Sequence, residues 1–522
     1  MKRLIALVTV AFFCLFCGCD TEKGADGISD KSAKQANGEG AAFENSGNED
    51  IAVFSYKPDT FCPVLSTNRA NNDMLGMVFD SLISLDEKMT PQPCLAKGWS
   101  AAEDFSVWKI ELRSDAAWHD GDAFCAKDVV YTVNQIASDE NSPYNYNVSN
   151  IKSIRAVGQS GVEITLLKPQ STFMNLLYFP IIKNSGKNVD KESYKPNGTG
   201  AYRFEDRNEG NVYYLVRNEK WWGSKPKTEV IKVKMLPDSD TALYAFSSGN
   251  IDMAKAESPD WGKFVDRSSD YAEMETPIFS FMGINHKNAV LGCEEVRRAI
   301  SKVIDREKIC QEAFMSCAEA AGAPTRAKWS VGQKKNFSVN TDEARRILKS
   351  GEWAETDGGY KKTIGKRRFT LGFNLLINEE NSVRKNIADI IKQNLGNFGI
   401  KVTVTSVSFE EYERRIASGR YDAFIGSVAV PADFNLDFFI GEGNHFGFEN
   451  EEISEKAKSA MAAEQGEALS REYKTLSGLF EKENPVIGLL FENTAVIYSK
   501  ALKDRPQFSY YNLYKGIENV SK

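Results

Sequence analysis

Apolar and polar residues follow two distinct periods through the body of this chain. Apolar side chains at every second position predict half-buried strands. Apolar side chains three or four positions apart predict the buried faces of amphipathic helices. The predicted strands lie near residues 108–112, 162–166, 231–235, 400–404 and 424–428, and the predicted helices near 126–136, 296–304, 383–395 and 409–416. This mixture indicates an α/β protein whose sheets are covered by helices.

The spacing of these elements predicts more than one lobe. Gly399 and Gly419 each close a predicted helix, as residues that tolerate positive φ do. A chain of 522 residues is too long for one ordinary hydrophobic core, so we expect two or three lobes. No repeat and no low-complexity linker interrupts the body of the sequence. The lobes must therefore be joined by short crossings, which suits a hinge.

The first 19 residues have the pattern of an export signal. Lys2 and Arg3 precede an apolar run over 4–15, which is too short to span a bilayer and ends near Gly18 and Cys19. A Cys directly after Gly at this point resembles a bacterial lipid-attachment site. We expect the mature protein to begin at a lipidated Cys19 and to lie outside the cytoplasmic membrane. A plain secretory signal is the alternative, and it predicts the same compartment.

Residues 20–49 predict a flexible tether. Phe43 and Ile28 are its only aromatic and branched aliphatic residues, and most of the others are small or polar. Such a segment cannot bury enough apolar surface to offset the entropy lost on ordering. It would link the lipid to the folded domain.

Composition limits the partners of the folded part. Apolar residues make up 42% of the chain and aromatic residues 11%, as in globular proteins. The net charge of −7, from 65 basic and 72 acidic residues, argues against a nucleic-acid partner.

The chain has nine cysteines, and six follow the signal and anchor. None forms a Cys-x-x-Cys pair, which disfavours a zinc site or a thioredoxin-like site. An even number in an oxidising compartment permits disulfides. Cys310 and Cys317 are close enough in sequence to pair, but the sequence does not fix the connectivity. The six are Cys62, Cys94, Cys125, Cys293, Cys310 and Cys317.

The sequence lacks the motifs of common enzymes. No Gly-x-Ser-x-Gly occurs, and the Ser-x-x-Lys matches at 149–152 and 382–385 lack their companion motifs. Ser382 is better explained as the cap of a predicted helix. His119, His286 and His445 have no metal-ligand spacing. We therefore predict no catalytic residue, no metal site and no cofactor.

An ordered series of segments resembles the bacterial extracellular solute-binding proteins of family 5, the peptide/nickel class. It starts with Leu85-Asp86-Glu87, Pro93-Cys94-Leu95-Ala96 and Trp118-His119-Asp120-Gly121. It continues with Asn197-Gly198-Thr199-Gly200, Arg217-Asn218, Ser248-Gly249-Asn250-Ile251-Asp252 and Val296-Arg297-Arg298-Ala299. Each segment is weak alone, and most are turns, caps and core. Cys125 stands where the family usually has a Ser or Thr helix cap, which weakens that helix start.

The resemblance implies the two-lobe fold of periplasmic binding proteins, of the class II type, with an inserted subdomain. Lobe I would comprise 50–74, 196–283 and 487–522. The inserted subdomain would comprise 75–195, and lobe II would comprise 284–486. Ligand would bind between the lobes and close them.

One short segment carries the ligand hypothesis. Ala432-Asp433-Phe434-Asn435 resembles the Ala-Asp-Tyr-Asn segment of oligopeptide-binding proteins. There the resemblance implies that the Asp pairs with the α-ammonium group of the peptide. The alternative is that Asp433 only caps a turn after Pro431. The other candidate cleft residues are Val430, Phe434, Trp329, Trp353, His445 and Phe446. Backbone near 51–56 and 427–430 is the candidate for binding a peptide as an added strand.

We therefore expect the protein to be a monomeric lipoprotein of the periplasm or cell surface. It would capture oligopeptides and deliver them to the permease subunits of an ABC-type importer, without breaking a bond. One alternative is a receptor of the same fold for a nickel chelate, haem, an oligosaccharide or an opine. Another is a surface lipoprotein for adhesion or signalling. Peptide length, residue preference and the identity of the importer do not follow from the sequence.

Overall fold

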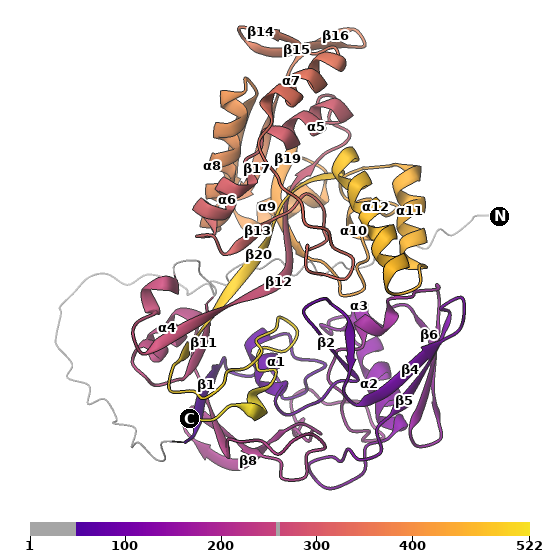
Figure 1. Ribbon diagram of the computed structural model, residues 1–522, viewed down its shortest axis with the longest axis vertical. Helices are drawn as coiled ribbons and strands as arrows, with labels where there is room; N and C mark the ends of the chain where they lie inside the picture. The colour runs from indigo at the N-terminus through magenta and orange to yellow at the C-terminus, as the bar shows by residue number, and fades with distance from the viewer. Residues whose placement is uncertain (1–48, 257–260) are drawn as a thin grey trace, which may run out of the picture.

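The structure of the protein is a computed structural model that describes residues 49–256 and 261–522 (Figure 1). The export signal, Cys19 and the tether lie outside the described residues. In Figure 1 an upper body and a lower body are joined by two long strands at the centre. Mixed helices and strands in two bodies confirm the predicted α/β architecture.

The lower body contains a four-stranded sheet with the order β1-β10-β9-β8. β1 runs parallel to β10, and the other pairs are antiparallel. Ile51, Val53, Ile231 and Val233 are fully buried and alternate with more exposed residues, so one face of this sheet packs into the core. α1 (Arg69–Leu75) lies against β1. The strands are β1 (Ile51–Ser55), β8 (Tyr202–Glu209), β9 (Val212–Arg217) and β10 (Val230–Met235).

A second sheet, with the order β4-β5-β7-β6, occupies the other half of the lower body (Figure 1). Trp108, Ile110 and Leu112 are buried on β5, as their alternation predicts. The strands are β4 (Ala96–Ala101), β5 (Val107–Leu112), β6 (Ile151–Val157) and β7 (Gly161–Leu166), and β2 (Ile83–Leu85) pairs with β3 (Pro91–Pro93). The helices are α2 (Ala126–Ala137), α3 (Asn145–Val148) and the 3₁₀ turn η1 (Phe173–Leu176).

The start of α2 compensates for the missing Ser or Thr cap. The backbone N–H of Cys125 donates to a carboxylate oxygen of Asp128 over 2.9 Å. The buried Asp128 also accepts from the indole of Trp118 and the backbone of Asn184. Asp128, in the first turn, therefore caps the N-terminus of α2 and connects the helix to Trp118 and Asn184.

A seven-stranded sheet links the two bodies, with the order β11-β20-β12-β19-β17-β18 and β13 paired to β20. The long antiparallel strands β12 and β20 run from the lower body into the upper body (Figure 1). Their register shifts between Glu275 and Phe279 and again between Ser280 and Phe281, which marks a point of local bending. The strands are β11 (Met253–Ala256), β12 (Ser269–Ile284), β13 (Ala318–Ala320), β17 (Gly372–Asn378), β18 (Lys401–Val407), β19 (Ala423–Ala429) and β20 (Val486–Ser499).

Helices surround the upper part of this sheet. Buried faces of α5 and α8 meet the strands, as their apolar spacing predicts. The helices are α5 (Glu294–Val303), α6 (Arg306–Ala313), α7 (Thr341–Ser350), α8 (Ser382–Asn397), α9 (Phe409–Ala417), α10 (Asp437–Ile440), α11 (Glu451–Met461) and α12 (Glu467–Glu483). A small sheet at the tip comprises β14 (Ala354–Thr356), β15 (Gly359–Ile364) and β16 (Arg367–Thr370), and the remaining elements are α4 (Ser239–Ser247), η2 (Trp261–Phe264) and η3 (Ile517–Asn519).

All six cysteines of the described part are free thiols. The pairing of Cys310 with Cys317, considered from their spacing, is therefore wrong. Cys310 packs in the helical core of the upper body, whereas Cys317 leads into β13 and lines the cleft described below. The two side chains belong to different environments despite their short separation in sequence.

Candidate ligand-binding cleft

A large cleft of about 4490 Å³ lies between the upper and lower bodies. Many segments of both bodies line it. Among them, the lower body contributes residues around 56–85, 140–150, 167–170 and 509–515, and the upper body contributes residues around 427–450. Such a concave site between bodies is where ligands bind in two-lobe proteins.

The upper wall contains the segment that follows β19. The backbone N–H of Val430 donates to the carbonyl of Pro277 over 2.9 Å, and that of Phe434 donates to Pro431 over 2.9 Å, which closes a turn. Phe434 has a φ of 60°, a conformation that side chains with a Cβ rarely adopt. Its ring packs on Tyr473, whose hydroxyl donates to the Phe434 carbonyl over 3.1 Å. Strain of this kind is retained at functional sites more often than elsewhere.

The carboxylate of Asp433 lies in this wall and is held by neutral donors. The side-chain amide of Gln170 donates to it over 2.7 Å, and the hydroxyl of Tyr146 contacts both oxygens at 3.2 and 3.3 Å. The backbone N–H of Asn435 donates over 3.2 Å. No basic side chain of the described residues forms a hydrogen bond or ion pair with Asp433. The negative charge is therefore stabilised only in part.

Burial raises the pKa of Asp433 from 3.8 to about 6, and the three donors oppose this rise. Only 1% of the residue is exposed. A buried carboxylate is poorly hydrated, so pairing with a cationic group of a ligand displaces less water than at an exposed carboxylate. The free energy gained by the pairing is therefore larger.

Both side-chain donors to Asp433 come from the lower body, near α3 and after β7. Thr172 and Asn175 extend this contact by donating to the carbonyls of Asp433 and Ala432. Tyr146 and Gln170 were not among the predicted site residues, because they lie 287 and 263 residues from Asp433 in the sequence. The tyrosines around Tyr144 and Tyr146 could have suggested a binding surface, since tyrosine combines an apolar ring with a polar hydroxyl and is common at interfaces. No feature of the sequence marks Gln170 as a site residue.

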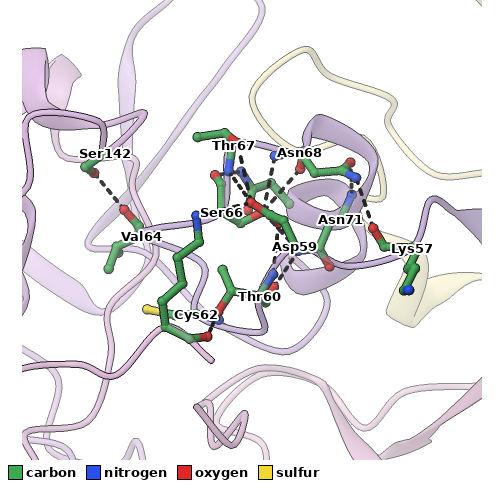
Figure 2. A network of polar contacts seen from close by, with 12 residues as sticks. Lys57, Asp59, Thr60, Cys62, Val64, Ser66, Thr67, Asn68, Asn71 and Ser142 are labelled. Carbon is green, nitrogen blue, oxygen red and sulfur yellow. Dashed lines mark hydrogen bonds and ion pairs between the residues drawn. The ribbon is translucent and has the colours of Figure 1, made fainter. Parts of the chain in front are cut away.

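A polar network fixes the opposite wall of the cleft (Figure 2). The carboxylate of Asp59 accepts from the hydroxyl of Ser66 over 2.6 Å and from the backbone N–H groups of Thr60 and Thr67 over 3.0 Å. The amide of Asn71 donates to the carbonyl of Thr60 over 2.7 Å. These bonds tie the loop that precedes α1 to the helix itself, so the cleft residues on both are held in place before ligand arrives.

The candidate residues divide between the cleft and the core. Val430, Asp433, Phe434 and His445 line the cleft. Trp329, Trp353 and Phe446 are buried and are not among its described lining residues, and Trp353 packs in the core of the upper body, next to β14.

Each of these three buried rings has a packing role. The ring of Trp329 lies 5.6 Å from that of Phe434. The ring of Phe446 stacks on Phe424 at 6.0 Å, in the aromatic core of the upper body. The indole of Trp353 donates to Glu295 over 3.3 Å. Trp329 thus supports the Asp433 turn from behind.

The second half of β19 offers a backbone edge to the cleft. β19 pairs with β12 along its length, from Ala423 to Ala429. On its other side β17 pairs with it only at Ala423 and Phe424. Ser427, Val428 and Ala429 line the cleft beyond this point. A strand with one open edge is a template for an added strand.

The histidines and the acidic residues of the described part do not assemble a metal centre. No group of three or more His, Cys, Asp or Glu side chains in residues 49–256 and 261–522 is arranged to hold a metal ion. His119 and His286 each contact a backbone carbonyl, and burial lowers the pKa of both to about 4. These two histidines are therefore neutral structural groups. Within the same described ranges, no helix has the length and hydropathy of a membrane span.

The chain is similar to a known family over most of its length. The family model for bacterial extracellular solute-binding proteins, family 5 Middle, matches residues 90–442. The oligopeptide-binding protein AppA of Bacillus subtilis is 23% identical over 549 residues, which cover 99% of this chain and 98% of the relative. A nickel-binding periplasmic protein of Escherichia coli is 24% identical over 392 residues, which cover 69% and 74%.

The fold is similar to solved structures as well. The periplasmic murein tripeptide binding protein MppA, in its unliganded open form, superposes with a TM-score of 0.78 at 17% sequence identity. The match covers 91% of this chain and 97% of that structure. Identities this low establish the two-lobe fold and leave the solute open.

Proposed function

The chain belongs to the bacterial extracellular solute-binding proteins of family 5, and on that premise we propose that its solute is an oligopeptide. Members of this family are the solute-binding proteins of ABC importers. They act outside the cytoplasmic membrane, and they are not enzymes. The finer assignment to peptides depends on the chemistry of the cleft.

The proposal depends mainly on the environment of Asp433. Its carboxylate lies in the cleft wall with a raised pKa and with neutral donors around it. The α-ammonium group of a peptide would supply the missing positive charge through a charge-assisted hydrogen bond. The long contacts to the hydroxyl of Tyr146, at 3.2 and 3.3 Å, mark the place where an ammonium group would compete for the same oxygens.

The charge of the surrounding wall agrees with a cationic group of the ligand. Four further acidic residues of the upper body line the cleft near Asp433, namely Asp437, Glu442, Glu449 and Glu451. An acidic wall attracts the positive end of a zwitterion and repels free anions.

The open edge of β19 supports binding of an extended backbone. Residues 427–429 would pair with the main chain of the peptide, and this pairing does not depend on side-chain identity. Oligosaccharides and haem lack the regular N–H and C=O groups that such an edge recognises. This feature therefore favours a peptide over the other solutes considered.

The remaining parts of the hypothesis concern delivery. We propose that the protein is a monomer anchored by lipid at Cys19 and that it hands its peptide to the permease subunits of its importer. We also propose the division into lobe I (50–74, 196–283 and 487–522), the inserted subdomain (75–195) and lobe II (284–486). Asp433 would then lie in lobe II, and its donors Tyr146 and Gln170 in the inserted subdomain.

Native mass spectrometry of the protein purified from its own host would test the choice of solute. We expect adducts whose masses resolve into short peptides with free α-amino groups. A nickel chelate, haem or an oligosaccharide as the retained solute would overturn the peptide assignment. A protein that retains nothing and binds no peptide from a random library would favour an adhesion or signalling role instead.

A further inference from the structure

The regular pairing of β12 with β20 is interrupted where these strands cross between the two bodies. Three residues of β12, 276–278, face a single residue of β20, Glu492. One of the three is Pro277, which has no backbone N–H to donate. Because buried backbone groups are costly when unpaired, the groups at this gap need partners outside the ladder. The regular pairs on either side of the gap are Glu275 with Asn493 and Phe279 with Phe491.

The gap separates the lower part of the crossing from its upper part (Figure 1). On one side, β20 pairs with β11 of the lower body over residues 495–498. On the other side, β12 pairs with β19 of the upper body over residues 278–284. A change of bend at the gap therefore changes the angle between the two bodies.

The side chain of Arg326 fills this gap and donates to both strands. Its Nε atom donates to the carbonyl of Thr276 over 2.9 Å, and a terminal nitrogen donates to the carbonyl of Glu492 over 3.0 Å. The same terminal nitrogen donates to the side chain of Asn493. Thr276 adds a bond across the gap, since its hydroxyl donates to the Glu492 carbonyl over 2.7 Å. One planar guanidinium group thus replaces ladder bonds that the irregular backbone does not form.

Several further contacts hold Arg326 in place. Its side chain is 1% exposed, and its other terminal nitrogen donates to the carboxylate of Glu319 over 3.0 Å. Glu319 belongs to β13, which pairs with β20 beside the same gap. The guanidinium group lies 4.9 Å from the ring of Phe491. Arg326 is not among the described lining residues of the cleft, so any effect that it has on a solute acts through other residues.

The chain that follows connects the gap to the lower body. We call residues 326–330 the hinge strap. The backbone N–H of Ser330 donates over 2.9 Å to the carbonyl of Lys88, in the turn between β2 and β3. The ammonium group of Lys328 lies 3.0 Å from the carboxylate of Glu275, the residue of β12 just before the gap. The hinge strap therefore joins the crossing strands to the lower body.

The hinge strap also contacts the upper wall of the cleft. The ring of Trp329 lies 5.3 Å from that of Phe491 in β20 and 5.6 Å from that of Phe434. The gap reaches the same wall directly, because the carbonyl of Pro277 accepts from the backbone N–H of Val430 over 2.9 Å. Close-packed contacts of this kind transmit displacements. A change of bend at the gap is therefore passed to the turn that follows β19.

We propose that Arg326 is a positioning residue for solute capture, because it sets the bend of β12 and β20 at the gap and so the opening of the cleft. An interrupted ladder without such a partner would bend over a wide range of angles. A rigid fork bonded to both strands favours one bend, and the hinge strap carries that bend to the upper wall. The inference depends on solute binding between the two bodies, and it does not depend on the choice of an oligopeptide as the solute.

Double electron–electron resonance on the full chain, without added solute, would test this role. Nitroxide labels on a genetically encoded keto amino acid at Ser247 of α4 and Lys392 of α8 would report the distance between the bodies and leave the free cysteines unmodified. Both positions are exposed. We expect a narrow distance distribution in the native protein. Arg326→Lys keeps the positive charge but loses the fork that bridges two carbonyls, so its distribution should be broader.

Arg297→Lys is the matched control. Arg297 is also buried, and it donates to the carbonyls of Glu483 over 2.9 Å and Gly292 over 2.7 Å, which lie outside β12 and β20. Its substitution should lower stability and leave the distance distribution narrow. Equal broadening in both variants would mean a general loosening of the fold and would overturn the proposal. An unchanged distribution in a folded Arg326→Lys protein would overturn it as well.

Thr276→Val tests the gap without removal of a buried charge. This variant keeps the shape of the side chain and loses the hydroxyl that donates to Glu492, so we expect a smaller broadening. If thermal unfolding followed by circular dichroism shows that Arg326→Lys is not folded, Thr276→Val decides, and a native distribution in it would overturn the proposal. None of these measurements uses a solute. Their failure would leave the peptide assignment intact, and failure of the peptide assignment would leave this test unchanged.

Discussion

Asp433 is surrounded by neutral donors, so the effect of removing its charge can be separated from the effect of removing its shape. Asp433→Asn keeps the size of the side chain and its contacts with Gln170 and Asn435 in part. It loses the charge that would bind the ammonium group. We expect peptide affinity to fall by more than about tenfold, or about 1.4 kcal/mol, in calorimetry.

Asp357→Asn is the matched control for this variant. Asp357 is exposed in the turn between β14 and β15, outside the described cleft lining, and we expect its substitution to leave affinity unchanged. An Asp433→Asn protein that binds peptide as the native protein does would eliminate the ammonium role. It would leave Asp433 as the cap of a turn.

The raised pKa of Asp433 predicts a pH dependence of binding. The carboxyl group titrates at about 6 in the free protein, and an ammonium ligand binds its ionised form. Affinity should therefore decrease as the pH falls from 7 to 5, and binding near pH 5 should release up to about one proton. Calorimetry in buffers of different ionisation enthalpy would measure that release.

Folding should respond to Asp433 in the opposite sense. Because its folded-state pKa lies above the ordinary value of 3.8, its contribution to stability is full below that pH and is lost as the pH rises through about 6. Glu492 also lines the cleft with a pKa raised by burial. Asp433→Asn separates the two, since any pH dependence that remains in this variant belongs to other groups such as Glu492.

The sequence predicted single site residues only where a local motif marked them. Asp433 was found because Ala432 to Asn435 form a recognisable run. Its donors Tyr146 and Gln170 come from distant segments without such a motif. Trp329 and Phe446 were candidates because aromatic residues line many clefts, but both pack in the interior. Periodicity shows that a side chain is buried, and it does not show which cavity lies nearby.

At the scale of elements, the open edge of β19 predicts a change in amide exchange. If the peptide pairs with residues 427–429, the backbone groups there that point away from β12 become hydrogen-bonded and lose contact with water on binding. Hydrogen–deuterium exchange should slow at these positions when peptide is added. The β18 edge of the same sheet lies away from the described cleft lining, and its exchange should not change. Binding with no added protection at 427–429 would contradict strand addition.

Strands and helices with a clean period were predicted well, and their ends less so. Ser382 was expected to cap α8, but Asn381 is the cap and accepts from the backbone of Arg384 over 2.9 Å. Both residue types cap well, so composition could not choose between them. The long strands β12 and β20 escaped prediction because their surroundings change along their length. The first half of β12 mixes exposed and buried residues and its end is a continuous buried run, so no single period describes it.

At the scale of the whole molecule, the two-lobe fold followed from the ordered series of segments and is confirmed. The open cleft did not follow, since its volume depends on how the bodies sit about β12 and β20. The long strands β12 and β20 cross between the bodies, and the register of the strand pair shifts at Glu275 to Phe281. A bend at this crossing would let the bodies rotate, at the cost of the hydrogen bonds that join the Asp433 segment to the lower body.

A ligand that bridges the two walls should therefore draw the bodies together. A bound peptide makes some contacts only when the two bodies are closed around it. These contacts lower the free energy of the closed arrangement, so binding shifts the equilibrium from open to closed. We expect small-angle X-ray scattering to show a smaller radius of gyration with saturating peptide than without it. Asp433→Asn at the same peptide concentration should keep the larger radius, because it lacks the contact with the bound terminus. A native protein that binds peptide at full occupancy with an unchanged radius would show that capture here needs no closure, and the crossing of β12 and β20 would then be a rigid spacer.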